Sequence, residues 1–351
     1  MIRVLILDDS ALVRQLLTEM LGRAPDIEVV GVAADPYIAR DKIKKLHPDV
    51  LTLDLEMPRM DGLTFLANLM RLRPMPVVVI SSLTGQGADI TLRALELGAL
   101  EIIAKPREDG VAGLADYQEM ILDKIRAAAK ARVRSRTALP GQDPGPPGAA
   151  ARLRVRGVHA RTPGKLIGIG ASTGGTEALK EVLGQLPPQM PGILICQHIP
   201  AIFCGPLAKR LDQHSDLTVA EARDGQPILP GHAYLAPGDH QLMVVWDGAR
   251  YICRVRDDPP FNRHRPSVDV LFQSMADQIG PKSIGVMLTG MGADGVDGLG
   301  QMRQAGAHVI AQDEKTSVIW GMPREVVRRG FADEVLALGK IAGRLIQLAE
   351  E

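Results

Sequence analysis

The sequence of 351 residues has few aromatic side chains and no excess of charge of either sign. Phe, Trp and Tyr together make up 3% of the chain, so there is no sign of a platform on which nucleic-acid bases would stack. The 41 basic residues are balanced by 41 acidic ones, so no net field attracts nucleic acid or an anionic membrane. No apolar run approaches the length of a membrane span. These absences disfavour nucleic-acid-binding and membrane proteins.

Cysteine is also scarce. Cys196, Cys204 and Cys253 show no paired spacing typical of a metal site, and an odd number of cysteines cannot form an even disulfide framework. This usage fits a reducing compartment. The first residues reach Asp8 after one short apolar run, which is unlike a signal peptide. We therefore expect a cytoplasmic protein, and a chain of this length is typical of two domains.

The first part of the chain, residues 1–125, alternates short β-branched runs with amphipathic segments. The predicted strands are Val4–Leu7, Val29–Ala33, Val50–Leu53, Val77–Ile80 and Glu101–Ala104. The predicted helices are Ala11–Gly22, Ile38–Lys45, Thr64–Arg71, Thr91–Leu97 and, at the end, Leu114–Arg132. This alternation predicts an α/β fold, a doubly wound (βα)5 domain with helices on both faces of a parallel sheet.

A segment rich in arginine, proline and glycine follows, at residues 126–163. Its centre, Leu139-Pro-Gly-Gln-Asp-Pro-Gly-Pro-Pro-Gly148, is too dense in proline and glycine to pack a core. The arginines on either side leave nucleic-acid binding open as an interpretation. Because no aromatic residues are interleaved with them, a solvated tether between two domains is favoured.

Residues 164–351 again show an α/β pattern. The predicted strands are Leu166–Ile169, Ile193–Gln197, Ala233–Ala236, Met243–Val245, Ser283–Leu288 and Val309–Ala311. The segment Gly231–Arg256 resembles a β-hairpin more than a βα unit. We expect a second domain with a mostly parallel sheet and a β-hairpin.

Several polar groups are predicted to meet at the carboxyl edge of the first sheet. Asp8 and Asp9 end the first strand, and Asp54 ends the third. Strand ends converge on one crevice in a doubly wound sheet, where three carboxylates would repel one another without a cation. Oxygen ligands of this kind suit Mg²⁺, which also bridges to phosphate. Ser81 and Lys105 end the fourth and fifth strands and add a hydroxyl and a positive charge to this rim.

The first domain resembles the receiver domain of bacterial response regulators. The matching stretches are Asp8-Asp9, Leu53-Asp54-Leu-Glu-Met-Pro58-Arg-Met-Asp-Gly62, Ser81 and Lys105-Pro106. The resemblance implies that Asp54 is the phosphorylated residue. It also implies that Ser81 and Lys105 contact the phosphoryl group. Mg²⁺ would be bound by a set of four residues: Asp8, Asp9, Asp54 and the backbone carbonyl of Glu56.

Two further points follow from this resemblance. It implies a cis peptide bond between Lys105 and Pro106. Many receivers carry an aromatic switch residue two or three positions before this lysine, but Ile102-Ile103 stand there in this chain. An aromatic readout of phosphorylation is therefore not expected.

The second domain begins with an apolar strand that runs into a glycine-rich turn. Gly170-Ala-Ser172-Thr-Gly174 matches the G-x-S-x-G nucleophile elbow, in which a tight turn exposes a serine hydroxyl. Gly168-x-Gly170 also matches half of a dinucleotide-binding fingerprint. A lone serine at this position would more often cap the following helix. The turn by itself therefore leaves a hydrolase and a cofactor-binding module open.

The next strands favour the hydrolase. A serine nucleophile needs a base, and His198 ends the next strand, where a dinucleotide-binding domain would instead place an acid. A carboxylate should orient this histidine, and Asp294 lies in a glycine-rich loop after a later strand. Asp297 is the rival carboxylate, ranked lower because a helix is expected to begin there. Backbone N–H groups of Gly290–Gly292 are candidate donors to an oxyanion.

Motifs throughout the second domain resemble the chemotaxis protein-glutamate methylesterase family, CheB. They are Gly168-Ile-Gly-Ala-Ser-Thr-Gly-Gly175, Gln197-His198-Ile-Pro, Ala236-Pro-Gly-Asp-His240, Arg265-Pro-Ser-Val-Asp269, Leu288-Thr-Gly-Met-Gly-Ala-Asp-Gly295 and Gly321-Met-Pro-Arg324. The resemblance implies a triad of Ser172, His198 and Asp294, with Met291 N–H as the oxyanion donor. It also implies demethylation of glutamyl methyl esters and deamidation of glutamines on chemoreceptors.

The same resemblance implies how the enzyme is controlled. The unphosphorylated receiver would cover the active site until a chemotaxis histidine kinase phosphorylates it. Hydrolysis itself would need no cofactor. Thr173 is a candidate for hydrogen bonding to the nucleophile or the substrate. Arg265 and Arg324 are candidates for contacts with acidic receptor surface, or for structural ion pairs. The alternatives that we keep are a response regulator with a DNA-binding output and a dinucleotide-binding module.

Overall fold

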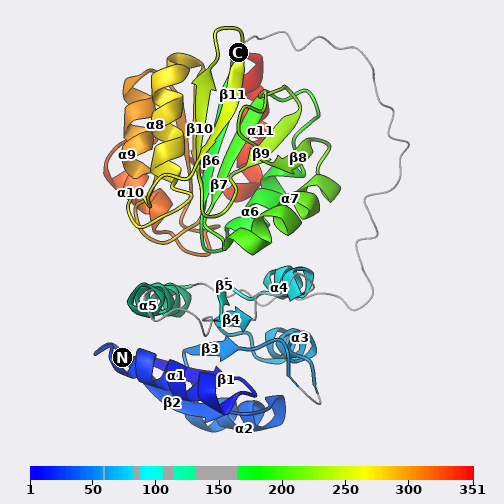
Figure 1. Cartoon of the computed structure of the whole chain (residues 1–351), viewed down its shortest axis with the longest axis vertical. Helices are drawn as coiled ribbons and strands as arrows, with labels where there is room; N and C mark the ends of the chain where they lie inside the picture. Colours follow the sequence, from blue (N-terminus) through cyan, green and yellow to red (C-terminus); the bar gives the residue numbers. More distant parts are fainter. Residues whose placement is uncertain (58–59, 82–86, 106–113, 132–163) are drawn as a thin grey trace.

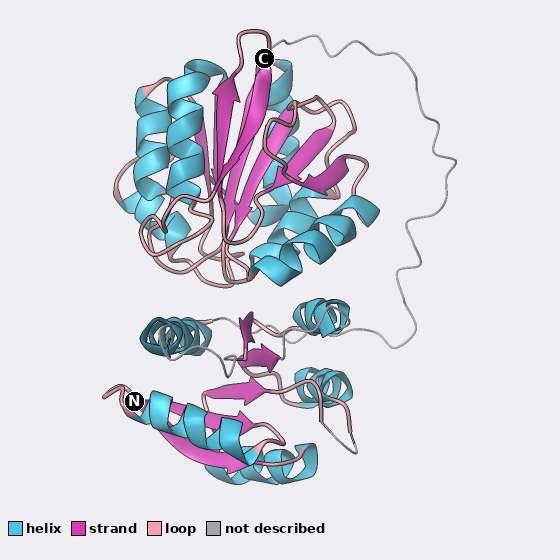
Figure 2. Ribbon diagram, in the orientation of Figure 1, coloured by secondary structure: helices cyan, strands magenta, loops and turns pink. Residues whose placement is uncertain are grey.

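The computed structural model describes residues 1–57, 60–81, 87–105, 114–131 and 164–351. Two α/β domains lie one above the other along the long axis in Figures 1 and 2, and the N-terminal one carries the chain start. Each domain has a central parallel sheet with helices on both faces. The predicted fold class of two α/β domains is confirmed.

The N-terminal sheet has the strand order β2-β1-β3-β4-β5, and all of its pairings are parallel. Its strands are β1 (Ile2–Leu7), β2 (Ile27–Ala33), β3 (Val50–Leu53), β4 (Val77–Ser81) and β5 (Glu101–Ala104). Its helices are α1 (Ala11–Gly22), α2 (Pro36–Leu46), α3 (Gly62–Leu72), α4 (Gly87–Glu96) and α5 (Leu114–Lys130). Helices α1 and α5 cover one face, while α2, α3 and α4 cover the other.

Side-chain caps explain where several of these helices begin. Ser10, Asp35 and Asp61 each accept a hydrogen bond from a backbone N–H of the helix that follows. Pro36 stands in the first turn of α2, where the missing N–H costs nothing. The caps of α1 and α3 place the starts of these two helices directly after the loops that carry Asp8, Asp9 and Asp54.

The C-terminal sheet has the strand order β14-β13-β12-β6-β7-β9-β8, and its pairings are also all parallel. Its strands are β6 (Leu166–Ala171), β7 (Gly192–Gln197), β8 (Thr218–Glu221), β9 (His232–Leu235), β12 (Ser283–Met287), β13 (His308–Gln312) and β14 (Glu334–Leu336). The helices are α6 (Gly175–Leu183), η2 (Ala201–Phe203), α7 (Cys204–Gln213), α8 (Val268–Gln278), η3 (Gly280–Lys282), α9 (Val296–Gln304), α10 (Met322–Arg328) and α11 (Leu338–Glu350).

The hairpin lies later in the chain than expected. Strands β10 (Gln241–Trp246) and β11 (Tyr251–Arg256) form a separate antiparallel pair, whereas the first strand of the predicted hairpin segment, β9, belongs to the main sheet. Apolar alternation identifies all three strands but does not say which of them pair. Helices α8, α9 and α10 and the hairpin cover one face of the main sheet, and α6, α7 and α11 cover the other.

The topology determines where the C-terminal domain can bind a ligand. Strand β6 is paired with β7 on one side and with β12 on the other, although β12 comes much later in the chain. Chain direction around the sheet therefore reverses at β6, and a crevice opens at the carboxyl ends of these strands. This edge of the sheet faces the N-terminal domain, whose helix α4 contacts α6, α7 and η2 (Figure 1).

Two of the sequence predictions fall largely outside the described residues. The first is the tether 126–163, of which the structure describes only residues 126–131, at the end of α5 and just after it. Pro106, and with it the expected cis bond after Lys105, also lies outside them. No helix in the described part of the chain is long and apolar enough to span a membrane.

Candidate active site

Ser172, His198 and Asp294 are brought together at the carboxyl edge of the C-terminal sheet. Ser172 follows β6, His198 follows the neighbouring strand β7, and Asp294 lies in the loop after β12, on the other side of β6. The His198 backbone N–H donates to the carbonyl of Ala171, which keeps the two strand ends in register. Parallel pairing of three strands thus brings residues 172, 198 and 294 to one place.

Glycines allow the close approach of the loops around Ser172. Gly174 has a φ of 76°, and a Cβ there would lie 2.7 Å from Val318. A Cβ on Gly290 would lie 2.8 Å from the Cβ of Ser172. Both distances are shorter than real Cβ contacts, so neither position accepts a side chain without a shift of its neighbours.

The two glycines of the half-matched dinucleotide fingerprint serve packing. A Cβ on Gly168 would lie 2.5 Å from Met275 Sδ, and a Cβ on Gly170 would lie 2.3 Å from Val268. Both contacted side chains belong to α8, which packs against the sheet at this point. These glycines therefore make room for α8. Their presence is explained by packing and does not require a bound dinucleotide.

Asp294 is buried and holds His198 by a short hydrogen bond. His198 Nε2 lies 2.8 Å from Asp294 Oδ2, and the Ser267 hydroxyl donates to Asp294 Oδ1 at 2.6 Å. The Val268 N–H also donates to this carboxylate, at 2.7 Å. Burial raises the pKa of Asp294, but its contacts with His198 and Ser267 outweigh burial and keep that pKa below the ordinary value. An ionised Asp294 can orient the imidazole and stabilise it once protonated.

Ser172 is half-buried and held mainly through its backbone. Its N–H donates to the Thr289 carbonyl at 3.0 Å, and its own carbonyl accepts from Gln197 Nε2 at 2.9 Å. Among the described residues the Ser172 hydroxyl has no hydrogen-bond partner. Since Asp294 engages Nε2 of His198, Nδ1 is the ring nitrogen that remains for the serine. Ser172 and His198 line one pocket.

The rival carboxylate and the two candidate arginines form ion pairs of their own. Asp297 is in the first turn of α9, largely exposed, and forms an ion pair with Arg329. Arg265 Nη1 lies 2.8 Å from Asp257 Oδ1, and Arg324 Nη2 lies 3.3 Å from Glu325 Oε1. Both arginines thus have partners within the chain.

His264 is a neighbour of the triad that sequence reasoning missed. Its ring stacks on that of His198 with centroids 4.0 Å apart and an angle of 4° between the planes. Burial, together with the nearby His198, lowers the pKa of His264 to about 4, so its ring is neutral at pH 7. Its only sequence signal was its place directly before the Arg265-Pro-Ser-Val-Asp269 motif.

Met291 lies on the loop that follows β12, directly after Gly290, which closely approaches Ser172. The carbonyl of the preceding Gly290 accepts hydrogen bonds from the N–H groups of Gly321 and Met322, and the Gly290 N–H donates to Ile319. These bonds fix the loop. Within the described part of the chain no acceptor takes the Met291 N–H.

The acidic residues of the N-terminal domain also lie together. Ligand atoms of Asp8, Asp9 and Asp54 lie within 4.8 Å of one another at the carboxyl edge of the sheet. Lys105 Nζ lies 2.7 Å from Asp54 Oδ2 and 2.9 Å from Asp8 Oδ2. Burial raises the pKa of Asp54 to about 6, even though the Lys105 ammonium acts in the opposite direction.

This donor set fits a hard divalent cation. Asp8 Oδ2 is buried and forms an ion pair with Lys105. No other group in the described part of the chain donates a hydrogen bond to this oxygen. Carboxylate oxygens gathered in this way suit Mg²⁺. Ser81, the last residue of β4, accepts a hydrogen bond from Thr91 of α4 at 3.2 Å, and Glu56 lies two residues after Asp54. The residues expected around a phosphoryl group thus lie at one rim.

Comparison with known proteins identifies the family. Residues 167–345 match the CheB methylesterase family, and residues 4–112 match the response regulator receiver domain. The chain belongs to the CheB methylesterase family. The resemblance drawn from the motifs is therefore confirmed.

Relatives with assigned names are similar to this chain in sequence over nearly its whole length. A protein-glutamate methylesterase/protein-glutamine glutaminase 1 of Xanthomonas campestris is 54% identical over 100% of this chain and 98% of its own. One from Bordetella parapertussis is 55% identical over 98% of this chain and 96% of its own. The crystal structure of the Thermotoga maritima CheB methylesterase catalytic domain has a TM-score of 0.52 and 40% identity, and covers 53% of this chain and 100% of its own.

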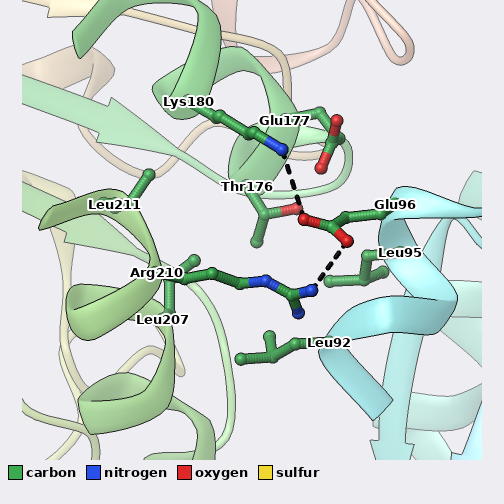
Figure 3. Close-up of a pocket in the computed structure, with 9 residues that line it drawn as sticks. All are labelled: Leu92, Leu95, Glu96, Thr176, Glu177, Lys180, Leu207, Arg210 and Leu211. Atoms are coloured by element: carbon green, nitrogen blue, oxygen red, sulfur yellow. Dashed lines mark hydrogen bonds and ion pairs between the residues drawn. The ribbon is translucent and has the colours of Figure 1, made fainter. Parts of the chain in front are cut away.

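The receiver domain lies against the edge of the C-terminal sheet that carries Ser172 and His198. Figure 3 shows Glu96 of α4 between two basic residues of the catalytic domain. Its carboxylate lies 3.2 Å from Lys180 Nζ on α6 and 2.6 Å from Arg210 Nη2 on α7. Leu92 and Leu95 line the same pocket, opposite Leu207. The contact therefore combines apolar packing with two ion pairs.

Proposed function

We propose that this chain hydrolyses glutamyl methyl esters on chemoreceptors and deamidates specific glutamines there. The observation that carries the proposal is that His198, which shares a pocket with Ser172, is held by a hydrogen bond to the buried Asp294 at the switch point of a parallel sheet. The names of the relatives state both activities for those proteins. Family membership and site geometry thus support the same reaction class.

The triad performs the ester reaction in two steps. With the Nε2–H of His198 donating to Asp294, Nδ1 is an acceptor and takes the proton of Ser172 as the hydroxyl attacks the ester carbonyl. A tetrahedral oxyanion forms, to which the Met291 N–H donates. His198 returns the proton to the leaving methoxide, and methanol departs. Water then attacks the glutamyl-Ser172 ester with His198 as base, which releases glutamate.

Deamidation follows the same path with a different leaving group. A glutamine carboxamide passes through the same kind of tetrahedral oxyanion, and ammonia departs in place of methanol. The glutamyl-serine intermediate and its hydrolysis are then identical. One set of residues, Ser172, His198, Asp294 and Met291, therefore serves both activities without a cofactor.

We further propose that the receiver, residues 1–125, controls this site through the tether 126–163. Side chains of the receiver, Leu95, Leu100, Glu101 and Ile102, line the pocket that contains Ser172 and His198, so a receptor helix cannot enter while they are there. A chemotaxis histidine kinase would transfer a phosphoryl group to Asp54. Asp8, Asp9, Asp54 and the Glu56 carbonyl would hold Mg²⁺, which neutralises charge on the phosphoryl group. The protein would act in the cytoplasm, where receptor signalling helices lie.

The catalytic assignment is tested by Ser172→Ala. The variant should release no methanol from methylated receptor membranes, because it lacks the hydroxyl that attacks the ester carbonyl. Its Asp54 should still accept phosphate from a small phosphodonor, and its circular dichroism should match that of the wild type, which shows that both domains are folded. Turnover close to wild type would show that Ser172 is not the nucleophile.

A further inference from the structure

The polar side-chain contacts between the two domains all have the same direction of charge. Among the described residues, three ion pairs and one hydrogen bond between side chains cross from one domain to the other. In each of them the receiver supplies the carboxylate and the catalytic domain supplies the cation or the donor. The ion pairs are Lys180–Glu96, Arg210–Glu96 and Arg263–Glu119, and the hydrogen bond runs from the Thr173 hydroxyl to Glu101 Oε1.

The three cations form a group that we call the basic rim: Lys180, Arg210 and Arg263. In the described part of the chain, none of them forms an ion pair within the catalytic domain. Arg265 and Arg324, the arginines that the sequence singled out, instead pair with carboxylates of their own domain. Movement of the receiver would therefore leave the positive charges of the basic rim without partners.

The basic rim flanks the pocket that contains Ser172 and His198. Thr176 lines both this pocket and the one formed by the basic residues of α6 and α7, so the two pockets adjoin (Figure 3). Arg263 directly precedes His264, whose ring stacks on that of His198. It lies on the loop that enters α8, and α8 covers the opposite face of the sheet from α6 and α7. Positive charge is thus presented from both sides of the crevice.

A tight turn holds Arg263 in its place. Phe261 and His264 exchange backbone hydrogen bonds of 3.0 and 2.8 Å, and the two residues between them, Asn262 and Arg263, have φ values of 50° and 66°. Positive φ at both central positions is typical of a type I′ turn, and it is costly for residues other than glycine. The Asn262 side chain donates to Asp269, which anchors the turn. Arg263 is 80% exposed at its tip.

We propose that the basic rim is the docking surface for an acidic segment of the receptor, formed by glutamates that flank the one being processed. This inference rests on the proposed function. The receiver, which lies on the rim in this structure, meets all three cations with carboxylates. A receptor segment with several modifiable glutamyl groups also carries a carboxylate wherever one of them has been processed. Charge complementarity of this kind speeds encounter and selects the partner.

The charges near the rim are consistent with such a partner. Glu177 of α6 is the acidic residue of the catalytic domain in the pocket of Lys180 and Arg210. Two positive charges there face one negative charge of the same domain. Receptor and receiver would therefore compete for the same positive charges, and the receptor would gain them when the receiver is displaced.

The test measures KM for methylated receptor membranes in chains activated by a small phosphodonor and Mg²⁺. Lys180→Gln, Arg210→Gln and Arg263→Gln combined should raise KM about tenfold, which corresponds to about 1.4 kcal/mol of binding. The kcat should change little, because none of these side chains contacts the triad. The wild-type KM should rise between about 0.05 M and about 0.3 M salt, whereas that of the triple variant should vary much less.

Two further chains separate docking from other effects of these substitutions. Glu96→Gln combined with Glu119→Gln breaks the same three ion pairs from the receiver side. In the activated state it should keep the wild-type KM, because the basic rim is intact. Lys180→Arg, Arg210→Lys and Arg263→Lys combined should also keep KM near the wild-type value, since all three charges remain.

The matched charge control is Arg250→Gln, Arg254→Gln and Arg303→Gln combined. It removes three charges whose ion-pair partners lie within the catalytic domain, and it should keep the wild-type KM and salt dependence. A rim variant with the wild-type KM, or an equal rise in KM in any control chain, overturns the inference. If the activated wild type releases no methanol from the receptor, the proposed function has failed instead.

Discussion

At the residue scale, the groups around Ser172 divide into those that follow strands and those that do not. His198 and Asp294 could be predicted because each follows an apolar strand of one parallel sheet, whose carboxyl ends must converge. His264 could not, because it lies on an irregular loop in which Asn262 and Arg263 take positive φ values. A hydrogen bond from Asn262 to the buried Asp269 anchors this loop, and no periodicity signals it.

His264 leads to a prediction about the pH dependence of stability. Its pKa is about 4 in the folded protein and about 6.5 in an unfolded chain, so between these values the unfolded state binds the extra proton. Stability therefore falls as pH falls through this window, by roughly 3 kcal/mol for this group. His198, Asp294 and Lys124 are the charged or titratable groups that face it.

His264→Phe removes this titration and keeps a ring against His198. We expect the Tm of the wild type minus that of the variant to fall as pH is lowered from 6.5 to 4, and to be constant above pH 7. Thermal unfolding of both full-length chains in matched buffers measures this difference. A difference that does not vary with pH would show that His264 does not titrate with a depressed pKa.

At the element scale, α4 connects the rim that carries Asp54 with the C-terminal domain. Thr91 of α4 donates a hydrogen bond to Ser81 at the rim of the Asp54 site. One turn further along the same helix, Leu95 and Glu96 contact the catalytic domain. A change at Ser81 that moves α4 would therefore alter this contact directly.

The ion pairs of Glu96 give a prediction at this scale. Glu96→Gln removes the charge that Lys180 and Arg210 share, and partly exposed pairs of this kind contribute about 0.5–1 kcal/mol each. The esterase activity of the unphosphorylated chain should rise by roughly 5- to 30-fold, because the closed arrangement loses about 1–2 kcal/mol. Activity with saturating phosphodonor should not change, which separates loosening of the interface from any effect on catalysis.

The matched control for this prediction is Glu119→Gln. Its pair with Arg263 also joins the two domains, but both side chains are mostly exposed, at 64% and 80%. It should leave the unphosphorylated activity nearly unchanged. An equal rise in both variants would show that any lost interdomain charge matters, and that α4 has no special role.

Sequence patterns predicted most elements but not all of their pairings. The five strands of the receiver follow from alternation of β-branched runs and amphipathic helices. Strands β8 and β14 were not predicted, because Thr218–Glu221 and Glu334–Leu336 are short edge strands without a continuous apolar run. The predicted hairpin began one strand too early, at β9. Which strands pair depends on contacts between residues far apart in the sequence, and apolar alternation does not report these.

At the scale of the whole molecule, the relative placement of the two domains has no sequence signal. The contact between α4 and the catalytic domain joins residues about a hundred positions apart, such as Glu96 and Arg210. Family resemblance alone suggested that the receiver covers the site. The structure adds which side chains lie at that contact, and Glu101 beside Thr173 is the one closest to the chemistry.

The central claim is that a serine esterase is held inactive by its own receiver until Asp54 is phosphorylated. The most direct test is methanol release from methylated receptor membranes by the wild type and by Asp54→Ala, each with and without a small phosphodonor and Mg²⁺. We predict that the phosphodonor raises the rate of the wild type at least tenfold, because phosphorylation must overcome both the apolar contact and the ion pairs. Asp54→Ala should stay at the low rate in both conditions. Equal rates in all four reactions would contradict the account.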